Sequence, residues 1–372
     1  MDQSIQDYLC FLKYCLHDEE EVPRCVERIS WKDLLCFAKK QSIVGVYWDG
    51  IVKMPDSTNN KPSEDDVMDW MGETVKLQRH GKKLDNRTVE VFNNLRADGF
   101  ECCVLKGQTN NRFYPSTYSR TPGDIDIWVY SSRNRLLYYI LDKFGKTVVS
   151  YHHLDYPFYS DTPIDAHTSP IYSTNPFNNI RVQKYFQSEA KRQMTNVIPL
   201  ADGSKVCGLT NDVNLLFQLM HLHKHLCYEG IGIRQLIDYF YLLKGASISQ
   251  EETISLINNI KRMHLAKFAN GIMYILHTKL GLDRKYCYMS EDPKEGEYIL
   301  SQMLIGGNFG RYDQRVQNYQ KRKYVFMRYP RKIAFVLSKW KHDPYEISWM
   351  PVFITVNWFI QHWYKWHYHL KW

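Results

Sequence analysis

The chain has 372 residues, of which 44% are hydrophobic and 15% aromatic, and its net charge is +8. This composition excludes an intrinsically disordered protein, and the length suits roughly two or three compact units. The N-terminal segment is acidic where an export signal would be basic, so we expect a cytoplasmic protein without a signal peptide. The nine cysteines are irregularly spaced and lack a Cys-x-x-Cys pair, which argues against a disulfide framework or a structural metal.

The first region, residues 1–98, is predicted to be helical. Apolar residues recur at helical spacing, and Ser30 and Ser63 each precede acidic residues in the pattern of a helix N-cap. Residues 55–62 (PDSTNNKP) predict a loop. We expect this region to be a scaffold without a catalytic role.

The second region, residues 99–208, changes to short strands and is predicted to be an α/β core. The expected strands are 101–105, 124–130, 147–152 and 163–167. The expected helices are 133–144 and 179–191, and Asp202-Gly203 predicts a hairpin turn. The whole chain is therefore predicted to be α+β, with a small mixed sheet flanked by helical regions.

The third region, residues 209–305, is predicted to be a helical domain that closes a cleft over the core. The expected helices begin at Thr210, carry apolar residues to 222 and from 233 to 243, and continue at 250–261, 264–280 and 294–304. The last region, residues 306–372, is a basic tail. Residues 311–372 contain twelve Lys and Arg against three acidic residues, together with six of the ten tryptophans.

The tail has no segment that could span a bilayer. Its most apolar run, 347–360, has 14 residues and contains Pro351 and Asn357, which is too short. Aromatic residues interleaved with Lys and His suit peripheral contact with a membrane surface or a nucleic acid. The alternative, which we favour, is that the tryptophans pack onto the helical domain while the charges face water.

The segment with the clearest chemistry is 104–128. Asp124 and Asp126 alternate with isoleucines in a predicted strand, so both carboxylates should project from one face while the isoleucines enter the core. Two like charges this close favour a bound metal ion. Gly107 suits a sharp turn where backbone amides approach a phosphate, and Lys106 adds a positive charge.

Two later patterns add polar side chains. Asp165 and His167 share one face of the strand predicted at 163–167. His221 and His225 lie four residues apart on one helix, a spacing that can hold zinc, but Lys224 lies between them and argues against a zinc hydrolase. These three residues line the cleft or link two helices, and both alternatives stay open.

Several of these motifs together resemble a known family. They are the Leu-Lys-Gly of 105–107, Tyr114-Pro115, the R-x-x-G-D-I-D-I of 120–127, the H-x-x-K-H of 221–225, and Arg234 with Asp238. This combination, over about residues 100–243, resembles the uncharacterised nucleotidyltransferase family of the DNA polymerase β-like superfamily.

The resemblance implies that three carboxylates hold two Mg²⁺ ions, with Mn²⁺ as an alternative. Asp124 and Asp126 match the first two, and Asp165 is the best candidate for the third, with Asp155 and Asp161 nearby. The nucleotide-binding residues it implies are Lys106, Gly107, Gln108, Arg120, Lys224 and Arg234. The further cleft candidates are His167, His221, His225 and Asp238, with Asp238 expected to orient an imidazole.

The sequence departs from the superfamily at Gln108, where a serine is usual. For Lys106 and Arg120 the alternatives are a surface lysine and an arginine that only pairs with Asp124. The implied function is Mg²⁺-dependent transfer of a nucleoside monophosphate from an NTP such as ATP to an acceptor, with pyrophosphate release. The acceptor could be a small molecule, a saccharide, a protein or RNA. The alternative is a nucleotide- or nucleic-acid-binding module with little or no catalysis.

Overall fold

The computed structural model describes residues 2–18, 21–315 and 325–368. The described chain is a mostly helical α+β protein in which a small mixed sheet is flanked by helices at both ends, as the sequence predicts. Residues 316–324 and 369–372 of the predicted basic tail, Trp372 among them, lie outside the described residues.

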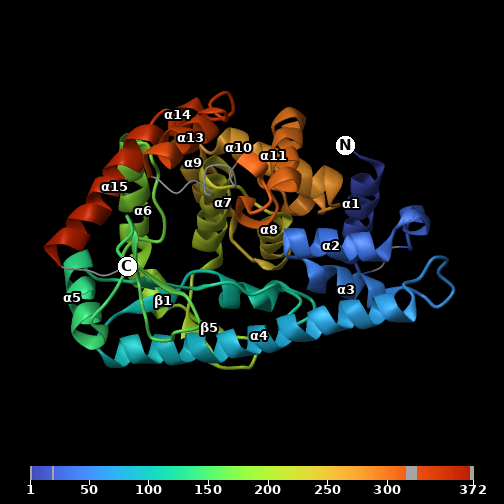
Figure 1. The fold of residues 1–372 in the computed structure, drawn as a ribbon, viewed down its shortest axis with the longest axis horizontal. Coiled ribbons are helices and arrows are strands. Elements are labelled where there is room, and N and C mark those ends of the chain that lie inside the picture. The colour runs from blue at the N-terminus through green and yellow to red at the C-terminus, as the bar shows by residue number, and fades with distance from the viewer. Residues whose placement is uncertain (1, 19–20, 316–324, 369–372) are drawn as a thin grey trace.

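The N-terminal region is helical, as predicted. Its elements are α1 (Gln3–Cys15), the 3-10 turn η1 (Arg24–Arg28), α2 (Trp31–Gln41), α3 (Val44–Lys53) and α4 (Glu64–Ala97). Ser30 caps α2, and Ser63 forms a reciprocal capping box with Asp66 at the start of α4. The 34 residues of α4 make a helix about 50 Å long, which runs along the lower edge of the molecule in Figure 1. Residues 55–62 form the predicted loop.

Four short strands form the mixed sheet. They are β1 (Cys102–Val104), β2 (Ile125–Val129), β3 (His153–Asp155) and β4 (Ile164–His167), in the order β1-β2-β4-β3. The central pair β2 and β4 is parallel, and both outer pairs are antiparallel. The register places Asp126 beside Asp165 and Asp165 beside Asp155. Because directly opposed residues point to the same face, this register gathers carboxylates on one side of the sheet.

One predicted strand is misplaced. The sequence pattern predicts a strand at 147–152, but the strand that joins the sheet is β3, at 153–155. Hydrogen bonds from Ser150 N to His153 O and from Asp155 N to Val148 O, each 3.0 Å, fold this segment back on itself. The apolar residues Val148 and Val149 therefore form the outer arm of a turn, and the polar second arm pairs with β4.

The other elements of the middle region follow the prediction closely. They are the 3-10 turn η2 (Gly107–Phe113), α5 (Arg133–Phe144), α6 (Pro176–Thr195), and the hairpin of β5 (Val197–Pro199) and β6 (Lys205–Cys207). Helix α6 begins earlier than predicted because Asn175 caps its first turn and Pro176 suits the first helical position.

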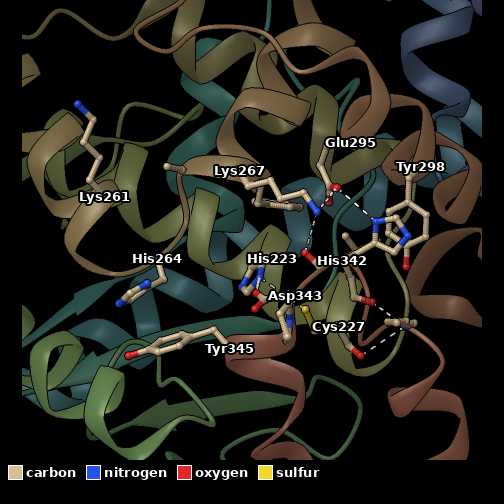
Figure 2. A pocket seen from close by; sticks show the side chains of 15 residues that line it. His223, Cys227, Lys261, His264, Lys267, Glu295, Tyr298, His342, Asp343 and Tyr345 are labelled. Atoms are coloured by element: carbon tan, nitrogen blue, oxygen red, sulfur yellow. Dashed lines mark hydrogen bonds and ion pairs between the residues drawn. The ribbon is translucent and has the colours of Figure 1, made fainter.

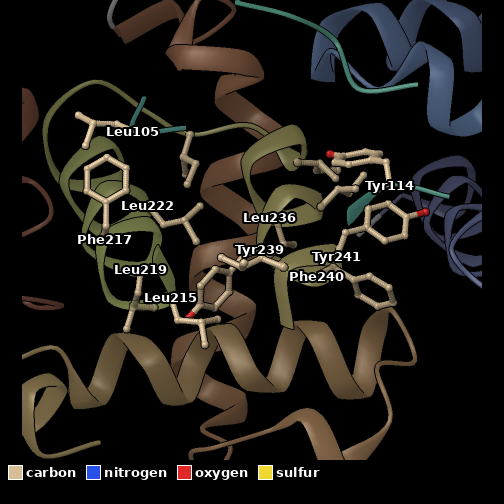
Figure 3. Packing of buried hydrophobic residues seen from close by; sticks show 14 of the residues in the cluster. Leu105, Tyr114, Leu215, Phe217, Leu219, Leu222, Leu236, Tyr239, Phe240 and Tyr241 are labelled. Carbon is tan, nitrogen blue, oxygen red and sulfur yellow. The ribbon is translucent and has the colours of Figure 1, made fainter. Parts of the chain in front are cut away.

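The C-terminal region is helical and centres on α7 and α8. Its elements are α7 (Asn211–Tyr228), α8 (Ile233–Gly245), α9 (Gln250–Arg262), α10 (Ala266–Tyr274) with the π turn η3 (Ile275–Lys279), the 3-10 turn η4 (Arg284–Tyr286), α11 (Pro293–Gly306) and the 3-10 turn η5 (Asn308–Gly310). Leucines of α7 and aromatic residues of α8 pack in one buried cluster, which Figure 3 shows. This packing holds α7 in place, and the polar side chains of α7 lie outside the apolar cluster.

The described part of the tail forms three further helices. They are α13 (Val325–Leu337), α14 (Pro344–Ile347) and α15 (Met350–His367). The end of α15 reaches α5, where Arg133 lies over the ring of Tyr364 and Tyr138 contacts Tyr368. None of the helices within the described ranges is both long and apolar enough to cross a membrane.

The favoured expectation that the tail's tryptophans pack inward is wrong for four of them. The exposed tryptophans are Trp340, Trp358, Trp363 and Trp366, and 75% of the surface of Trp366 is accessible to solvent. Helix α15 instead buries Phe353 and Ile354, because only that face meets the body of the protein. Trp358, Trp363 and Trp366 lie on its other sides, and Trp340 precedes α14.

Candidate active site

A cavity of about 410 Å³ lies over the carboxylate face of the sheet. Strands β2, β3 and β4, the C-terminal half of α7, and Lys332 and Asn357 of the tail all contribute to its walls. Of the predicted site residues, the following eight line it: Lys106, Asp124, Asp126, Asp165, His167, His221, Lys224 and His225. Side chains from four separate parts of the chain therefore meet in one space.

The carboxylates form the floor of this cavity. His167 Nε2 lies 2.8 Å from Asp126 Oδ1. Burial alone would raise the pKa of Asp126, but the charge of Lys106 and the hydrogen bond from His167 outweigh it and hold that pKa well below the usual range. Burial and the neighbouring Asp126, Asp124 and Asp155 raise the pKa of Asp165 to about 8. Asp165 therefore keeps its proton to a higher pH than a free carboxyl group does.

Lys106 connects the floor to the opposite wall. Its ammonium group lies 3.2 Å from Asp126 Oδ2 and donates a hydrogen bond of 2.8 Å to His221 Nε2. The side chain is only 14% exposed, so the surface-lysine alternative is wrong. Gly107 follows with φ of +72°, a backbone conformation that favours glycine. The turn places the lysine inside the cavity.

Arg120 lies beneath the cavity and is committed to another partner. Its guanidinium donates two hydrogen bonds, of 2.7 and 2.9 Å, to the carboxylate of Asp238, and Tyr114 donates a third of 2.7 Å. The alternative that Arg120 pairs with Asp124 is therefore wrong. Asp238 was expected to orient an imidazole, and its buried carboxylate instead accepts from an arginine and a tyrosine.

Arg234 has more capacity to bind a ligand. Its Nη1 donates a 3.2 Å hydrogen bond to the carbonyl of Thr121, while its buried Nε has no hydrogen-bond partner in the described structure. A side chain added at Gly123 would press against this guanidinium at 3.4 Å. Arg234 and Asp124 both border a small extension of the main cavity.

Helix α7 supplies the wall that faces the sheet. His221 Nε2 and His225 Nε2 lie 3.0 Å apart, and the ammonium group of Lys224 donates a 3.2 Å hydrogen bond to His152. Burial and the charge of Lys106 hold the pKa of His221 well below its usual range. Burial lowers the pKa of Lys224 to about 8. These residues both line the cavity and link neighbouring elements, so the two alternatives are compatible.

Gln108 is not among the residues that line the cavity. It is buried inside η2, and its Oε1 has no hydrogen-bond partner among the described residues. Of the other candidates for the third carboxylate, Asp155 lies beside Asp165 in the sheet, borders an adjoining cavity, and has a ligand atom within 4.8 Å of those of His153 and Asp165. Exposed Asp161 pairs instead with Lys83 and Arg87.

Comparison with known proteins identifies the family of the chain. A family model described as "Uncharacterised nucleotidyltransferase" matches residues 27–281, which include every predicted site residue. The chain belongs to this family. No curated protein matches it. The chain is also similar to the crystal structure of an antigenic nucleotidyltransferase-like protein from Paracoccidioides brasiliensis, with a TM-score of 0.31 and 11% identity over 58% of this chain and 97% of that chain.

Sequence reasoning missed several residues that line the cavity. They are His152, His153, Tyr172, Glu229, Lys332 and Asn357. Burial lowers the pKa of His153 to about 3 and that of His152 well below its usual range, so both imidazoles are neutral. The adjacent pair His152-His153 was a usable signal, but the misplaced strand at 147–152 obscured it. Nothing in the sequence around Lys332 or Asn357 indicates that these tail residues line the cavity.

The donor atoms on the floor fit a metal ion, with which membership of the family is consistent. Asp126, Asp165 and His167 offer ligand atoms within 4.8 Å of one another. Asp126 Oδ2 is buried and accepts no hydrogen bond from the residues that the structure describes, although the charge of Lys106 is near. Mg²⁺ prefers carboxylate oxygens and retains several waters, for which the cavity has room. His167 is better suited to orienting Asp126 through its other oxygen.

Proposed function

We propose that this cavity transfers a nucleoside monophosphate from an NTP to an acceptor and releases pyrophosphate. The observation that supports the proposal most strongly is the meeting of Asp124, Asp126 and Asp165 with Lys106 and Lys224 in one cavity. Carboxylates that can hold metal and cations that can hold phosphate are the two parts that phosphoryl chemistry requires. A cavity of about 410 Å³ suits a small-molecule ligand.

The three aspartates would hold Mg²⁺, with two ions expected and Mn²⁺ as an alternative. When bound, such ions stabilise the charge that develops on the attacking and leaving oxygens. Asp126 is held in place by His167, and Asp165 is aligned beside it by the pairing of β2 with β4. Deprotonated carboxylates at fixed positions are what such a site needs from the protein.

The triphosphate would lie against the cations. Lys106 and Lys224 face the floor from two sides, and Arg234 offers an unpaired Nε–H at the extension of the cavity. The turn at Gly107 brings backbone amides close to the same space. Arg120 supports this region by fixing Asp238, which we interpret as positioning rather than direct binding.

We infer that His152 and His153, which line the cavity at the start of β3, contact the acceptor. His153 is neutral at physiological pH and its Nε2 lies 3.8 Å from Asp165 Oδ2. A neutral imidazole can donate or accept a hydrogen bond and so can orient an acceptor hydroxyl.

The nine cysteines are free thiols, which supports the proposal of a cytoplasmic protein. We also propose that the chain divides functionally at about residues 98, 208 and 305.

The test is pyrophosphate release from each of the four common NTPs with Mg²⁺, across saccharide, protein and RNA acceptors. Wild type should release pyrophosphate with at least one combination, and Asp124→Asn and Asp126→Asn should fall to background. Asp56→Asn, a change of an exposed loop acid, is the matched control and should retain activity. Equal release by wild type and Asp126→Asn would refute the proposal.

Binding of a non-hydrolysable NTP should be measured alongside, because it separates the main proposal from its alternative. Mg²⁺-dependent binding that Asp126→Asn weakens, together with release, supports the enzyme. Binding without release from any NTP and acceptor pair would favour the nucleotide-binding module instead.

A further inference from the structure

A second cavity, of about 310 Å³, lies against the opposite face of α7 (Figure 2). Its lining comes from the C-terminal half of α7, the ends of α9, α10 and α11, and the segment that leads into α14. His223, Cys227 and Asp343 converge at one side of it, and Figure 2 shows these side chains close together. None of the three lines the cavity over the sheet.

The ligand-type atoms of this trio are close and mostly buried. His223 Nε2 lies 2.6 Å from Asp343 Oδ2 and 3.6 Å from Cys227 Sγ, and all three atoms lie within 4.8 Å of one another. Asp343 Oδ1 accepts from the backbone N–H of Glu346, which leaves Oδ2 directed at the trio. His223 and Cys227 lie one helical turn apart and so share a face of α7.

Hydrogen bonding alone describes this cluster incompletely. A single Nε2 position carries at most one hydrogen, yet both a carboxylate oxygen and a sulfur approach that same nitrogen. In a Cys-His-Asp catalytic triad, the sulfur and the carboxylate contact different nitrogens of the imidazole. Convergence on one point, from three donor types that bind zinc, is the arrangement of a metal site.

We propose that His223, Cys227 and Asp343 bind one Zn²⁺ ion, with water from the adjoining cavity as the fourth ligand. Tetrahedral zinc keeps its ligand atoms about 3.3–3.8 Å apart, so the sulfur is already placed and the short His223–Asp343 contact opens slightly. On binding, the Sγ proton of Cys227 and the Nε2 proton of His223 leave to solvent, and Asp343 binds as its carboxylate.

The ion would fasten the tail to the helical region. Other contacts already join the same two parts: Lys339 donates to the carbonyl of Leu226, and Lys267 of α10 donates a 3.0 Å hydrogen bond to the carbonyl of His342. Helix α15 follows directly and contributes Asn357 to the cavity over the sheet. Zinc at this point would therefore stabilise one wall of the proposed active site from a distance.

The experiment uses the full chain, purified without a histidine tag and stripped of metal, with Co²⁺ as a spectroscopic probe and Zn²⁺ as competitor. One equivalent of Co²⁺ should give the near-ultraviolet thiolate-to-cobalt absorption of a tetrahedral site, and Zn²⁺ should remove it. Cys227→Ser should abolish the band, and Asp343→Asn should weaken binding by at least about tenfold. Cys287→Ser, which changes a half-buried cysteine elsewhere, should leave the band unchanged.

Two outcomes would overturn the zinc site. One is a wild-type protein with no thiolate band at stoichiometric Co²⁺, and the other is the same band in Cys227→Ser. The wild-type spectrum decides even if a variant fails to fold. Because Asp126→Asn should keep the band, failure of this proposal is distinguishable from failure of the proposed enzyme.

A separate observation concerns the outer face of α15. Val352, Val356, Phe359, Trp363 and Trp366 recur at intervals of three and four residues and are between 45% and 75% exposed. This spacing places them along one stripe of the helix. We call these five residues the α15 stripe.

We infer that the α15 stripe binds the surface of an anionic membrane. The helix has no acidic residue, and its basic side chains are Lys365, His362 and His367, of which the two histidines flank the stripe; this charge complements anionic lipid headgroups. A second copy of the helix would bring the same basic groups together without acids to pair them. Tryptophan is the side chain best suited to the headgroup region.

Vesicle sedimentation tests this inference. The full chain should bind vesicles that contain phosphatidylglycerol, less tightly as salt rises, and Trp363→Ser/Trp366→Ser should weaken binding at least about tenfold. Ile254→Ser, at a comparably exposed apolar residue of α9, is the control and should bind as wild type. No binding to anionic vesicles, or a stable dimer that the double variant dissolves, would overturn it.

Discussion

Helix α7 separates two cavities with different chemistry, and two of its histidines show the contrast most clearly. His221 faces the carboxylate cavity and His223 faces the second cavity, although only one residue separates them. Burial lowers the pKa of both. At His221 the charge of Lys106 adds to this effect, whereas at His223 Cys227 and Asp343 outweigh it and raise the pKa well above the usual range.

The difference teaches that the neighbours of a residue, rather than its type, decide what it can bind. The cavity over the sheet offers carboxylate oxygens and ammonium groups, which suit Mg²⁺ and phosphate. The second cavity offers nitrogen, sulfur and a single carboxylate, which suit Zn²⁺. One helix can therefore serve two metals because its side chains alternate between two environments.

The largest expected effect comes from changing one cavity and measuring both. Asp126→Asn should reduce pyrophosphate release to background and leave the cobalt–thiolate band intact. Cys227→Ser should remove the band and retain measurable release. If either variant abolished both signals while circular dichroism showed a folded protein, the two cavities would not be chemically independent.

The next largest effect separates two arginines of the carboxylate side. Arg120→Met leaves Asp238 buried without its bidentate partner, so the free energy of unfolding should fall by about 3–5 kcal/mol. Arg234→Met removes a guanidinium that makes one described hydrogen bond, and should mainly weaken NTP binding. Urea unfolding and nucleotide titration of both variants give the comparison. Equal stability of Arg120→Met and wild type would contradict the positioning role.

Much of this arrangement follows from local patterns. Alternation within strands correctly placed Asp126 and Asp165 on one side of the sheet, and Asp124, which directly precedes β2, borders the same cavity. Cap residues located the starts of α2 and α4. Such features depend on neighbours within a few residues, so they can be predicted from the sequence alone.

Features that depend on distant pairing could not be predicted. Arg120 meets Asp238 across 118 residues and His223 meets Asp343 across 120, and nothing local marks either pair. The pair His152-His153 was missed for a different reason, because the apolar Val148-Val149 outweighed it in placing the strand. The exposed tryptophans of α15 were misjudged because burial depends on which elements cover a helix.

A smaller effect should come from pH acting on Asp165. Its pKa in the folded protein, about 8, lies above the ordinary 3.8, so the folded state holds a proton that the unfolded chain releases. Between pH 3.8 and about 8, the free energy of unfolding in magnesium-free buffer should therefore fall as pH rises, by up to about 1.4 kcal/mol per pH unit. Asp165→Asn should lose this part of the slope, and Asp56→Asn should keep it. Parallel slopes for wild type and Asp165→Asn would contradict the shift.

The smallest effect concerns the turn that places Lys106 in the carboxylate cavity. Gly107 has φ of +72°, and a Cβ there would lie no closer than 3.8 Å to its neighbours. The cost of Gly107→Ala is therefore conformational, about 1 kcal/mol, rather than a clash.

Gly72→Ala is the matched control, because that glycine lies within α4 and a Cβ added to it meets nothing within 4 Å. Alanine should stabilise this helix position by up to about 1 kcal/mol. Opposite signs in urea unfolding, with reduced NTP binding for Gly107→Ala alone, would show that the turn serves the cavity. Equal shifts of the same sign would show that the backbone at Gly107 is not special.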